Sequence, residues 1–432
     1  MSPHIRRINV AEVFLWGKLL GAVAWGEDRG RAEFEFDPAF IRQGLNMAPL
    51  TMPLQKVIYA FSELKKVTYH GLPGLLADAL PDRFGNRLID LWLSTHGRSA
   101  SDFNPIERLC YMGTRAMGAL EFSPALGVKN ESSAPIEIAE LVALVDQVLH
   151  DREGLNANIS TSRKKALQSI IRVGTSAGGN RAKAVIAWNP KTDEIRSGQV
   201  KTPVDFEPWI LKFDGVNDSS LGDPQGFGRI EYAYYLMAQK AGIKMMPCRL
   251  LEEGARAHFM TKRFDRDEHH EKIHMQSLCA IAHYDFNAAG EYGYEQLFQV
   301  ILKLNLGHDA LQEAYRRMLF NVMARNQDDH TRNMAFLMDK AGTWRLSPAF
   351  DLVWAYNPSG SWTNRHQMSV NGKRDAFTDE DLDMPAKQFD IRKAADIRQE
   401  VKDAVSTWRQ CAKEAGVTKA MAETIQATHR LI

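Results

Sequence analysis

Alternating apolar and polar residues mark the first part of the chain. The stretches AEVFLWGKLLGAVAW (residues 11–25) and RAEFEFDPAF (31–40) contain short alternations separated by turn residues, a pattern typical of half-buried strands. Helical stretches follow around GLLADALPDRFGNRLIDLWL (74–93). The pattern from residue 8 to about residue 122 therefore predicts a small α+β unit.

A change of composition marks the end of this unit. GVKNESSAP (127–135) is rich in Gly, Ser, Asn and Pro, and the apolar spacing of three and four in IEIAELVALVDQVLHD (136–151) predicts an amphipathic helix. Apolar runs on both sides of NPKTDE (189–194) indicate a β-hairpin, and PWILKFDG (208–215) indicates a short buried strand. A β-rich lobe is expected here.

Helices dominate the rest of the chain. One helix is predicted within the β-rich lobe, ending at Gly242, and a strand pair that turns on EEG follows it. A further hairpin is expected over residues 334–350, between helices. The predicted C-terminal helices cover 294–306, 310–326 and 394–415. The fold class is therefore expected to be α+β, with domains over residues 1–126, 127–285 and 286–432.

Composition and charge narrow the function classes. The 54 basic and 53 acidic residues nearly cancel, which argues against binding to nucleic acid or membrane by bulk charge. The four cysteines are far apart and form no CxxC pair, as expected in a reducing compartment. No apolar run reaches the roughly 20 residues that span a bilayer. We therefore expect a cytoplasmic protein without a signal peptide or membrane anchor.

The acidic stretch RNQDDHTRN (325–333) carries the strongest chemical signal. It lies between the apolar runs YRRMLFNVMA and MAFLM, where Asp, Asn and His are costly unless they are paired, hydrogen-bonded or bound to a metal. Asp328 is followed by Asn333 five residues later, then by a hairpin and Asp351. In phosphoryl transfer such residues accept a hydroxyl proton and hold Mg²⁺. Asp329 is a second candidate base, although the spacing favours Asp328.

Two further features suit a nucleotide phosphate. VGTSAGGNRAK (173–183) places glycines before a predicted strand, so that backbone N–H groups could approach phosphate oxygens; a plain flexible turn is the alternative. Lys212 lies in a predicted buried strand and could bind phosphates, or it could face water on an edge strand. Glu231, on the next predicted helix, could pair with it.

A family resemblance joins these pieces. ADALPDRFGN (77–86), YMGTRAMGALEF (111–122), TSAGGNRAK, ILKFDG, TKRFDR (261–266), NQDDHTRN and LSPAFDL resemble, in this order, the motifs of HipA-type serine/threonine kinases, the toxins of HipBA type II toxin–antitoxin modules. The resemblance covers most of the chain. It implies a two-lobed protein-kinase-like fold with an additional N-terminal α+β subdomain.

The resemblance also assigns roles by position. Asp328 resembles the catalytic base, His330 matches the loop histidine, and Asn333 and Asp351 resemble the Mg²⁺ ligands. ATP binding is implied for Lys212 and for five other positions. These are the hinge residues Lys262 and Phe264, acting through backbone groups near adenine, and Gly178, Gly179 and Lys183 of the Gly-rich loop. Autophosphorylation is implied at Ser176 or, alternatively, Thr175.

The implied activity is an ATP- and Mg²⁺-dependent serine/threonine protein kinase that arrests growth. Its expected substrate is a protein of translation such as an aminoacyl-tRNA synthetase, and its expected partner is a HipB-like helix-turn-helix antitoxin, through which alone it would meet DNA. A small-molecule phosphotransferase, an inactive corepressor or scaffold, and a metal-dependent nuclease using Asp328, Asp329 and Asp351 are the alternatives. The histidines of RDEHHEKIHM (266–275) are interpreted as a solvated loop.

Overall fold

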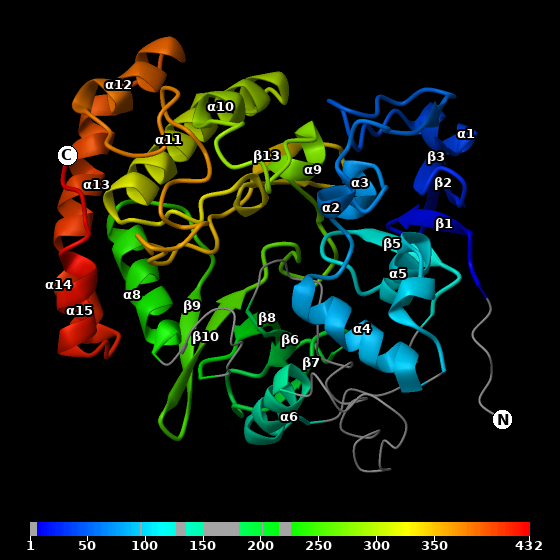
Figure 1. Cartoon of the computed structure of the whole chain (residues 1–432), viewed down its shortest axis with the longest axis horizontal. Coiled ribbons are helices and arrows are strands. Elements are labelled where there is room, and N and C mark those ends of the chain that lie inside the picture. Colours follow the sequence, from blue (N-terminus) through cyan, green and yellow to red (C-terminus); the bar gives the residue numbers. More distant parts are fainter. Residues whose placement is uncertain (1–6, 96, 127–134, 151–180, 201, 216–225) are drawn as a thin grey trace. The chain divides into compact units, whose positions relative to one another are not determined.

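The computed structural model describes residues 7–95, 97–126, 135–150, 181–200, 202–215 and 226–432 (Figure 1). The chain divides into two compact units. Unit 1 holds residues 1–47, 52–225 and 251–275, and unit 2 holds residues 48–51, 226–250 and 276–432. The expected three-part division has other boundaries and stays a prediction. Within the described ranges, no helix is long and apolar enough to cross a membrane.

The first sheet of unit 1 is antiparallel, in the order β4-β3-β2-β1-β5. Its central strands alternate buried and exposed residues, as in Arg31–Phe36, where Phe34 and Phe36 are buried and Glu35 is exposed. This confirms the strands predicted from the alternating pattern. The strands are β1 (Val10–Leu15), β2 (Lys18–Gly26), β3 (Arg31–Phe36), β4 (Ile58–Tyr59) and β5 (Leu120–Ser123).

Short helices accompany this sheet in the N-terminal part of unit 1. The carboxylate of Asp37 caps α1 by accepting from the backbone N–H groups of Ala39 and Phe40. Asn104 and Glu107 form a capping box at α5. The helices are α1 (Pro38–Gln43), α2 (Lys66–Tyr69), α3 (Gly74–Ala77), α4 (Arg83–Thr95), the 3₁₀ helix η1 (Ala100–Asp102) and α5 (Pro105–Met112).

The second sheet of unit 1 has the order β7-β6-β8-β10-β9. All six residues of β6 are buried, which fits a central strand covered on both faces. The hairpin predicted around residues 189–194 and the strand predicted over 208–215 are both confirmed. The elements are α6 (Ile138–His150), β6 (Lys183–Trp188), β7 (Ile195–Ser197), β8 (Glu207–Lys212), β9 (Cys248–Glu253) and β10 (Arg256–Lys262).

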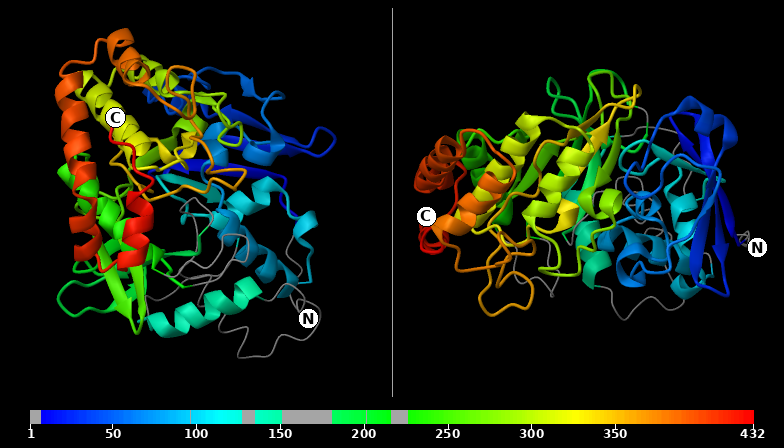
Figure 2. Two further views of the ribbon diagram at one scale, coloured as in Figure 1. Left: turned by 60° about the vertical axis from the view of Figure 1, so that its left-hand side comes forward. Right: turned by 90° about the horizontal axis from the view of Figure 1, so that it is seen from above.

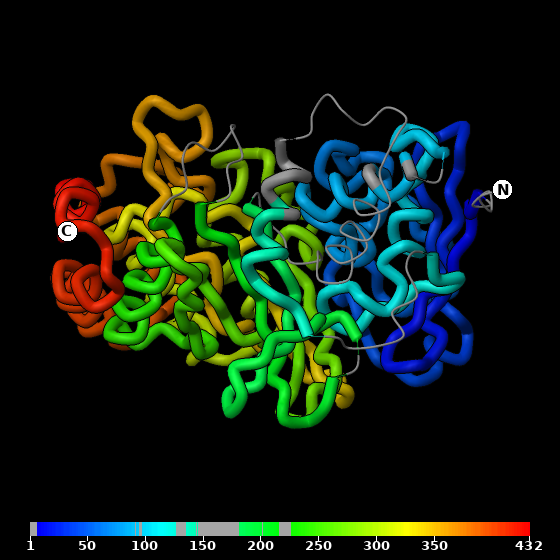
Figure 3. The backbone as a smooth tube through the Cα atoms, turned by 90° about the horizontal axis from the view of Figure 1, so that it is seen from below, coloured from blue at the N-terminus to red at the C-terminus, as the bar shows by residue number. Residues whose placement is uncertain are grey.

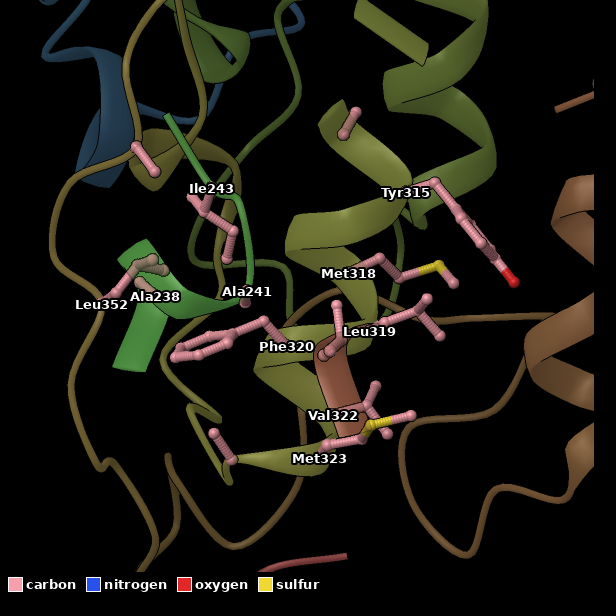
Figure 4. Close-up of a cluster of buried hydrophobic side chains, with 14 of the residues drawn as sticks. Ala238, Ala241, Ile243, Tyr315, Met318, Leu319, Phe320, Val322, Met323 and Leu352 are labelled. Carbon is pink, nitrogen blue, oxygen red and sulfur yellow. The ribbon is translucent and has the colours of Figure 1, made fainter. Parts of the chain in front are cut away.

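Unit 2 is built around helix α11, whose residues Leu319 and Phe320 are fully buried. Figure 4 shows these side chains in one buried cluster with Ile243 and Leu352, which come from segments distant in the sequence. The elements of this part, α11 included, are α8 (Phe227–Lys240), β11 (His274–Ser277), α9 (Leu278–Ala282), α10 (Tyr294–Lys303), α11 (His308–Met323), the 3₁₀ helix η2 (Thr331–Asn333), β12 (Ala335–Met338) and β13 (Trp344–Leu346).

The C-terminal helices pack against α8 and α11, and Figures 2 and 3 show them together in orange and red. The sequence predicted a single helix over 394–415, but the structure has two. Thr407 separates them: its hydroxyl donates back to the Ala404 carbonyl, and Trp408 is buried. These helices are α12 (Asp379–Gln388), α13 (Ala394–Ser406), α14 (Trp408–Glu414) and α15 (Lys419–Gln426).

Candidate active site

The acidic loop of unit 2 is fixed at both ends by buried chain. It begins where α11 ends, at Ala324, and Arg325 has a positive φ of 57° that turns the chain away from the helix. It ends at β12, whose four residues are all buried. The loop therefore lies between two buried segments, as its flanking sequence predicted.

The two adjacent aspartates of this loop have opposite surroundings. The Asp329 side chain is fully buried. It accepts hydrogen bonds from the Tyr294 hydroxyl at 2.9 Å and from the Gln367 backbone N–H at 2.8 Å, and it lies 2.8 Å from His366 Nδ1. The Asp328 side chain is 41% exposed. Asp329 therefore anchors the loop, whereas Asp328 is the carboxylate that a substrate can reach.

A buried chain of hydrogen bonds supports the anchor. Asn326 Nδ2 donates to Asn321 Oδ1 at 2.9 Å, and Asn321 Nδ2 donates to the Tyr294 hydroxyl at 2.9 Å. The same hydroxyl donates to Asp329. Burial, followed by the nearby charge of Asp329, raises the pKa of Tyr294 well above its usual value, so the phenol stays protonated and able to donate. Buried polar networks of this kind hold a backbone in one arrangement.

The candidate metal ligands flank the β12–β13 hairpin. Asn333 precedes β12 by two residues, and its Nδ2 donates to the Asp328 carbonyl oxygen at 2.8 Å. Asp351 follows β13 and has a positive φ of 53°. Its carbonyl oxygen accepts from Asn326 Nδ2 at 3.4 Å. Because the two strands are antiparallel, the hairpin returns the chain toward the acidic loop, and Asn326 links that loop to Asp351.

The donors present fit magnesium. Because Asn333 uses Nδ2 for its hydrogen bond, its Oδ1 can face a cation, and Asp351 supplies a carboxylate. One amide oxygen and one carboxylate, completed by water and nucleotide phosphates, form a common Mg²⁺ set. In the part of the chain that the structure describes, no group of three or more His, Cys, Asp or Glu residues could hold a metal by itself.

His330 lies beside the exposed carboxylate. Its Nε2 is 3.7 Å from Asp328 Oδ1. Its ring contacts Phe286 and Trp362, with centroids 5.4 and 6.2 Å away. These contacts fix the imidazole at the edge of the site, where it can help to shape the approach to Asp328.

In unit 1, two candidate ATP-binding lysines are cross-strand neighbours. Lys183 on β6 is directly opposite Lys212 on β8, so their side chains leave the same face of the sheet. Both residues are buried, with 5% and 9% exposed. Ammonium groups that leave one face of a sheet side by side are suited to binding the phosphates of a nucleotide.

The predicted hinge contains one solvent-facing and one buried ion pair. Lys262 Nζ donates to Glu207 at 2.8 Å, and both side chains are about one-third exposed. This pairing is compatible with a hinge in which only the backbone near Lys262 and Phe264 contacts adenine. Arg263, two residues before Asp265, forms a buried two-point hydrogen bond with its carboxylate, at 2.8 and 2.7 Å.

Asp265 also explains why the YMGTRAMGALEF motif contains Gly118. The Gly118 backbone N–H donates to Asp265 Oδ2 at 2.8 Å. Gly118 has a φ of 74°, and a Cβ there would lie 2.9 Å from the backbone nitrogen of Met275. Only glycine allows this close approach. The motif therefore fastens the N-terminal part of unit 1 to the segment after the hinge.

The site residues predicted from sequence fall into three sets. Asp328, His330, Asn333 and Asp351 lie together in unit 2, whereas the lysines and the hinge belong to unit 1. Four positions of the Gly-rich loop lie outside the described residues, namely Thr175, Ser176, Gly178 and Gly179. Glu231, considered as a partner of Lys212, is buried on α8 of the other unit.

The histidine-rich segment is only partly a solvated loop. His269 is exposed, but His274 is buried in β11, and burial lowers the pKa of His274 to about 3. Sequence reasoning also missed Tyr294, Trp362, His366 and Gln367. A tryptophan within the turn-rich stretch NPSGSWTN (357–364) was the available signal, because turns are usually polar.

Comparisons with known proteins agree with these features. A protein from Haemophilus influenzae named "Putative kinase" is 31% identical over 107 residues, which cover 22% of this chain and 30% of that protein. A protein from Sinorhizobium fredii named "Putative kinase Y4mE" is 23% identical over 370 residues, which cover 80% of this chain and 77% of that protein.

A solved structure shares the fold. It is a chain of the Shewanella oneidensis MR-1 toxin–antitoxin complex of HipA, HipB and operator DNA, with a TM-score of 0.65, 16% identity, and coverage of 96% of this chain and 94% of that one. The expected α+β, kinase-like fold with an N-terminal subdomain is thereby confirmed. The family model of the HipA N-terminal domain matches residues 11–123, and that of the HipA-like C-terminal domain matches residues 175–429. This chain belongs to the HipA family.

Proposed function

We propose that the protein is an ATP- and Mg²⁺-dependent serine/threonine protein kinase. The observation that carries the proposal is the difference in burial between Asp328, which is exposed, and Asp329, which is buried and hydrogen-bonded. A buried network fixes Asp329 and leaves the neighbouring carboxylate accessible, as a proton acceptor in a reaction on a hydroxyl group requires. Asn333 and Asp351 flank the hairpin that follows, in the order that phosphoryl transfer uses.

In the proposed reaction, the hydroxyl oxygen of a substrate serine or threonine attacks the γ-phosphorus of ATP. The bond between the γ-phosphorus and the bridging oxygen breaks, and ADP leaves with the bonding electron pair. Asp328 accepts the hydroxyl proton. Asn333 Oδ1 and Asp351 would hold Mg²⁺, which supplies charge neutralisation at the phosphates. Lys212 and Lys183 would bind phosphate oxygens from the sheet of unit 1.

The biological role follows from the family. We propose a growth-arresting toxin that phosphorylates a protein of translation, such as an aminoacyl-tRNA synthetase, in the cytoplasm. The related Shewanella oneidensis structure contains HipB and operator DNA, which supports a HipB-like antitoxin as the partner and DNA contact through that antitoxin. The four cysteines are free and buried, which is compatible with a reducing compartment.

Autophosphorylation at Ser176, or alternatively Thr175, belongs to the same proposal. A phosphate there carries about −1.5 to −2 charges at neutral pH. It would compete with ATP for the backbone N–H groups of the Gly-rich loop and would repel the nucleotide, so the modified kinase should be inactive. Mass spectrometry of the protein after incubation with Mg-ATP tests this. A protein that phosphorylates other substrates but never these two residues contradicts the switch.

The proposed activity is tested with purified protein, radiolabelled ATP and casein as a serine-rich acceptor. Wild-type protein should transfer phosphate to itself and to casein, and Asp328→Asn should do so only at a residual rate, lower by about a hundredfold or more. Phosphate transfer to small molecules alone would indicate a phosphotransferase acting on metabolites. ATP binding without any transfer would indicate an inactive scaffold, and either result would overturn the proposal.

A further inference from the structure

One tryptophan contacts the candidate base directly. The Trp362 indole Nε1–H donates to Asp328 Oδ1 at 2.5 Å, across 34 residues of sequence. The nearest His330 nitrogen lies 3.7 Å from this same oxygen. Among the described residues, none donates a hydrogen bond to the other oxygen, Oδ2. One carboxylate oxygen is therefore occupied and the other is available.

The tryptophan is held in place through the buried anchor. Gln367 is buried, and its Nε2 donates to the carbonyl oxygens of Trp362 and, at 3.2 Å, Arg365. The Gln367 backbone N–H donates to Asp329 Oδ1 at 2.8 Å. Residues 362–367, here called the clamp segment, thus hold both aspartates. Asp328, Asp329, Gln367 and Trp362 form a closed ring of covalent and hydrogen bonds.

The chemistry of indole suits this position. Its N–H is a donor only, so it can bind a carboxylate but cannot remove the substrate proton itself. Hydrogen bonds to an ionised acceptor are among the stronger ones in proteins. The ring of Trp362 also contacts His330, which limits its movement. A donor fixed in this way stops the Asp328 carboxylate from rotating between equivalent orientations.

We propose that Trp362 is a positioning residue that orients Asp328 so that Oδ2 receives the proton of the substrate hydroxyl. This inference rests on the proposed kinase function. The oriented carboxylate needs no reorganisation when the hydroxyl arrives, which is how preorganised groups contribute to catalysis. The effect acts on the chemical step and leaves ATP binding alone, because Trp362 hydrogen-bonds to the base and is not one of the candidate ATP-binding residues.

The test compares two tryptophan-to-phenylalanine variants. Trp362→Phe keeps an aromatic ring and removes the N–H. The control is Trp354→Phe, which removes an indole hydrogen bond of 3.0 Å to Thr428 Oγ1 elsewhere in unit 2. With casein and ATP, Trp362→Phe should lower kcat by about tenfold, as expected for a lost hydrogen bond to a charged group. Its KM for ATP should stay within about twofold, and the control should match wild type.

A second comparison separates positioning from general damage. In the Asp328→Asn background, Trp362→Phe should cause no further loss of the residual rate, because its effect passes through the carboxylate. If Trp362→Phe does not fold, Gln367→Met tests the same ring, since it removes the donor to the Trp362 carbonyl and leaves the indole present. A fall in kcat at constant KM for ATP is again expected.

Several outcomes would overturn the inference. An unchanged kcat in folded Trp362→Phe would mean that the hydrogen bond orients nothing of importance, while the kinase function itself would stand. A raised kcat would mean that the indole blocks the base instead of positioning it. Equal losses in Trp362→Phe and Trp354→Phe would indicate a structural effect. A wild-type protein without phosphoryl transfer would remove the proposed function, and the inference with it.

Discussion

Asp328 and Asp329 are adjacent in the sequence, yet their side chains are 41% and 0% exposed. The buried carboxylate is surrounded by the Tyr294 hydroxyl, the His366 imidazole and the Gln367 backbone N–H. These partners hold Asp329 inside, while the neighbouring Asp328 carboxylate remains exposed. A short loop can thus be held rigidly by one aspartate while the other remains accessible to a substrate.

Removing the two carboxylates should therefore have different consequences. Asp329→Ala leaves three buried polar groups without their partner and should lower the free energy of unfolding by about 3 kcal/mol. Asp328→Ala should change it by less than about 1 kcal/mol while abolishing transfer to casein. Urea denaturation and the kinase assay measure the two effects. A stable Asp329→Ala protein, or an active Asp328→Ala protein, would contradict the assignment.

The lysines of unit 1 allow a matched comparison. Lys212→Met should raise the KM for ATP by about tenfold or more, because a buried charge on the sheet is lost at the phosphates. Lys262→Met breaks only a pair with Glu207 in which both side chains are about one-third exposed, and solvent-exposed pairs are worth about 0–1 kcal/mol. Its KM for ATP should therefore stay close to wild type. Equal losses in the two variants would mean that the hinge has been misplaced.

Magnesium dependence should identify the ligand residues. Asn333→Ala removes one neutral oxygen donor and should raise the Mg²⁺ concentration for half-maximal activity by about tenfold. Asp351→Asn removes a charged donor and should abolish activity at any practical Mg²⁺ concentration, with the fold retained. Magnesium titrations of the kinase rate, with circular dichroism as the check on folding, measure both. Full activity of folded Asp351→Asn would count heavily against a kinase mechanism.

The protein should lose stability in mild acid, in part because of His429. Burial, followed by the positive charge of Arg325, lowers the pKa of His429 to about 4, against about 6.5 in an unfolded chain. The folded state thus favours the neutral ring. The stability that depends on the neutral ring is fully present above about pH 6.5 and is lost as the pH falls toward about 4. Between pH 7 and pH 5 the free energy of unfolding should fall by about 2 kcal/mol because of His429.

The variant His429→Phe isolates this contribution. Phenylalanine can keep the ring contacts with Tyr234 and Trp408 and has no titrating group. Between pH 4 and 6.5, the free energy of unfolding of this variant should therefore fall less steeply with decreasing pH than that of wild type. The difference in slope should correspond to about one proton fewer taken up on unfolding. Urea denaturation at several pH values measures it. Identical slopes would show that His429 is not held neutral.

The sequence by itself determined the local elements and the order of the candidate site. Strand alternation, helical spacing and turn residues encode structure over a few neighbouring positions, so the β6–β7 and β12–β13 hairpins and the extent of α8 could be predicted. The spacing from Asp328 to Asn333 is local in the same way. The single helix predicted over 394–415 was wrong because the Thr407 side chain and the burial of Trp408 end α13.

Only the tertiary structure decided which aspartate is exposed and which groups hold it. Three partners of Asp328 and Asp329 are Trp362, His366 and Gln367, which are 34, 37 and 38 residues away along the chain. No local period records such contacts, because they depend on how distant segments pack. The position of Lys183 directly opposite Lys212 also depends on long-range packing, since strand register is set by pairing across the sheet. The residue types of the site can thus be read from the sequence, whereas their burial and orientation arise from long-range packing.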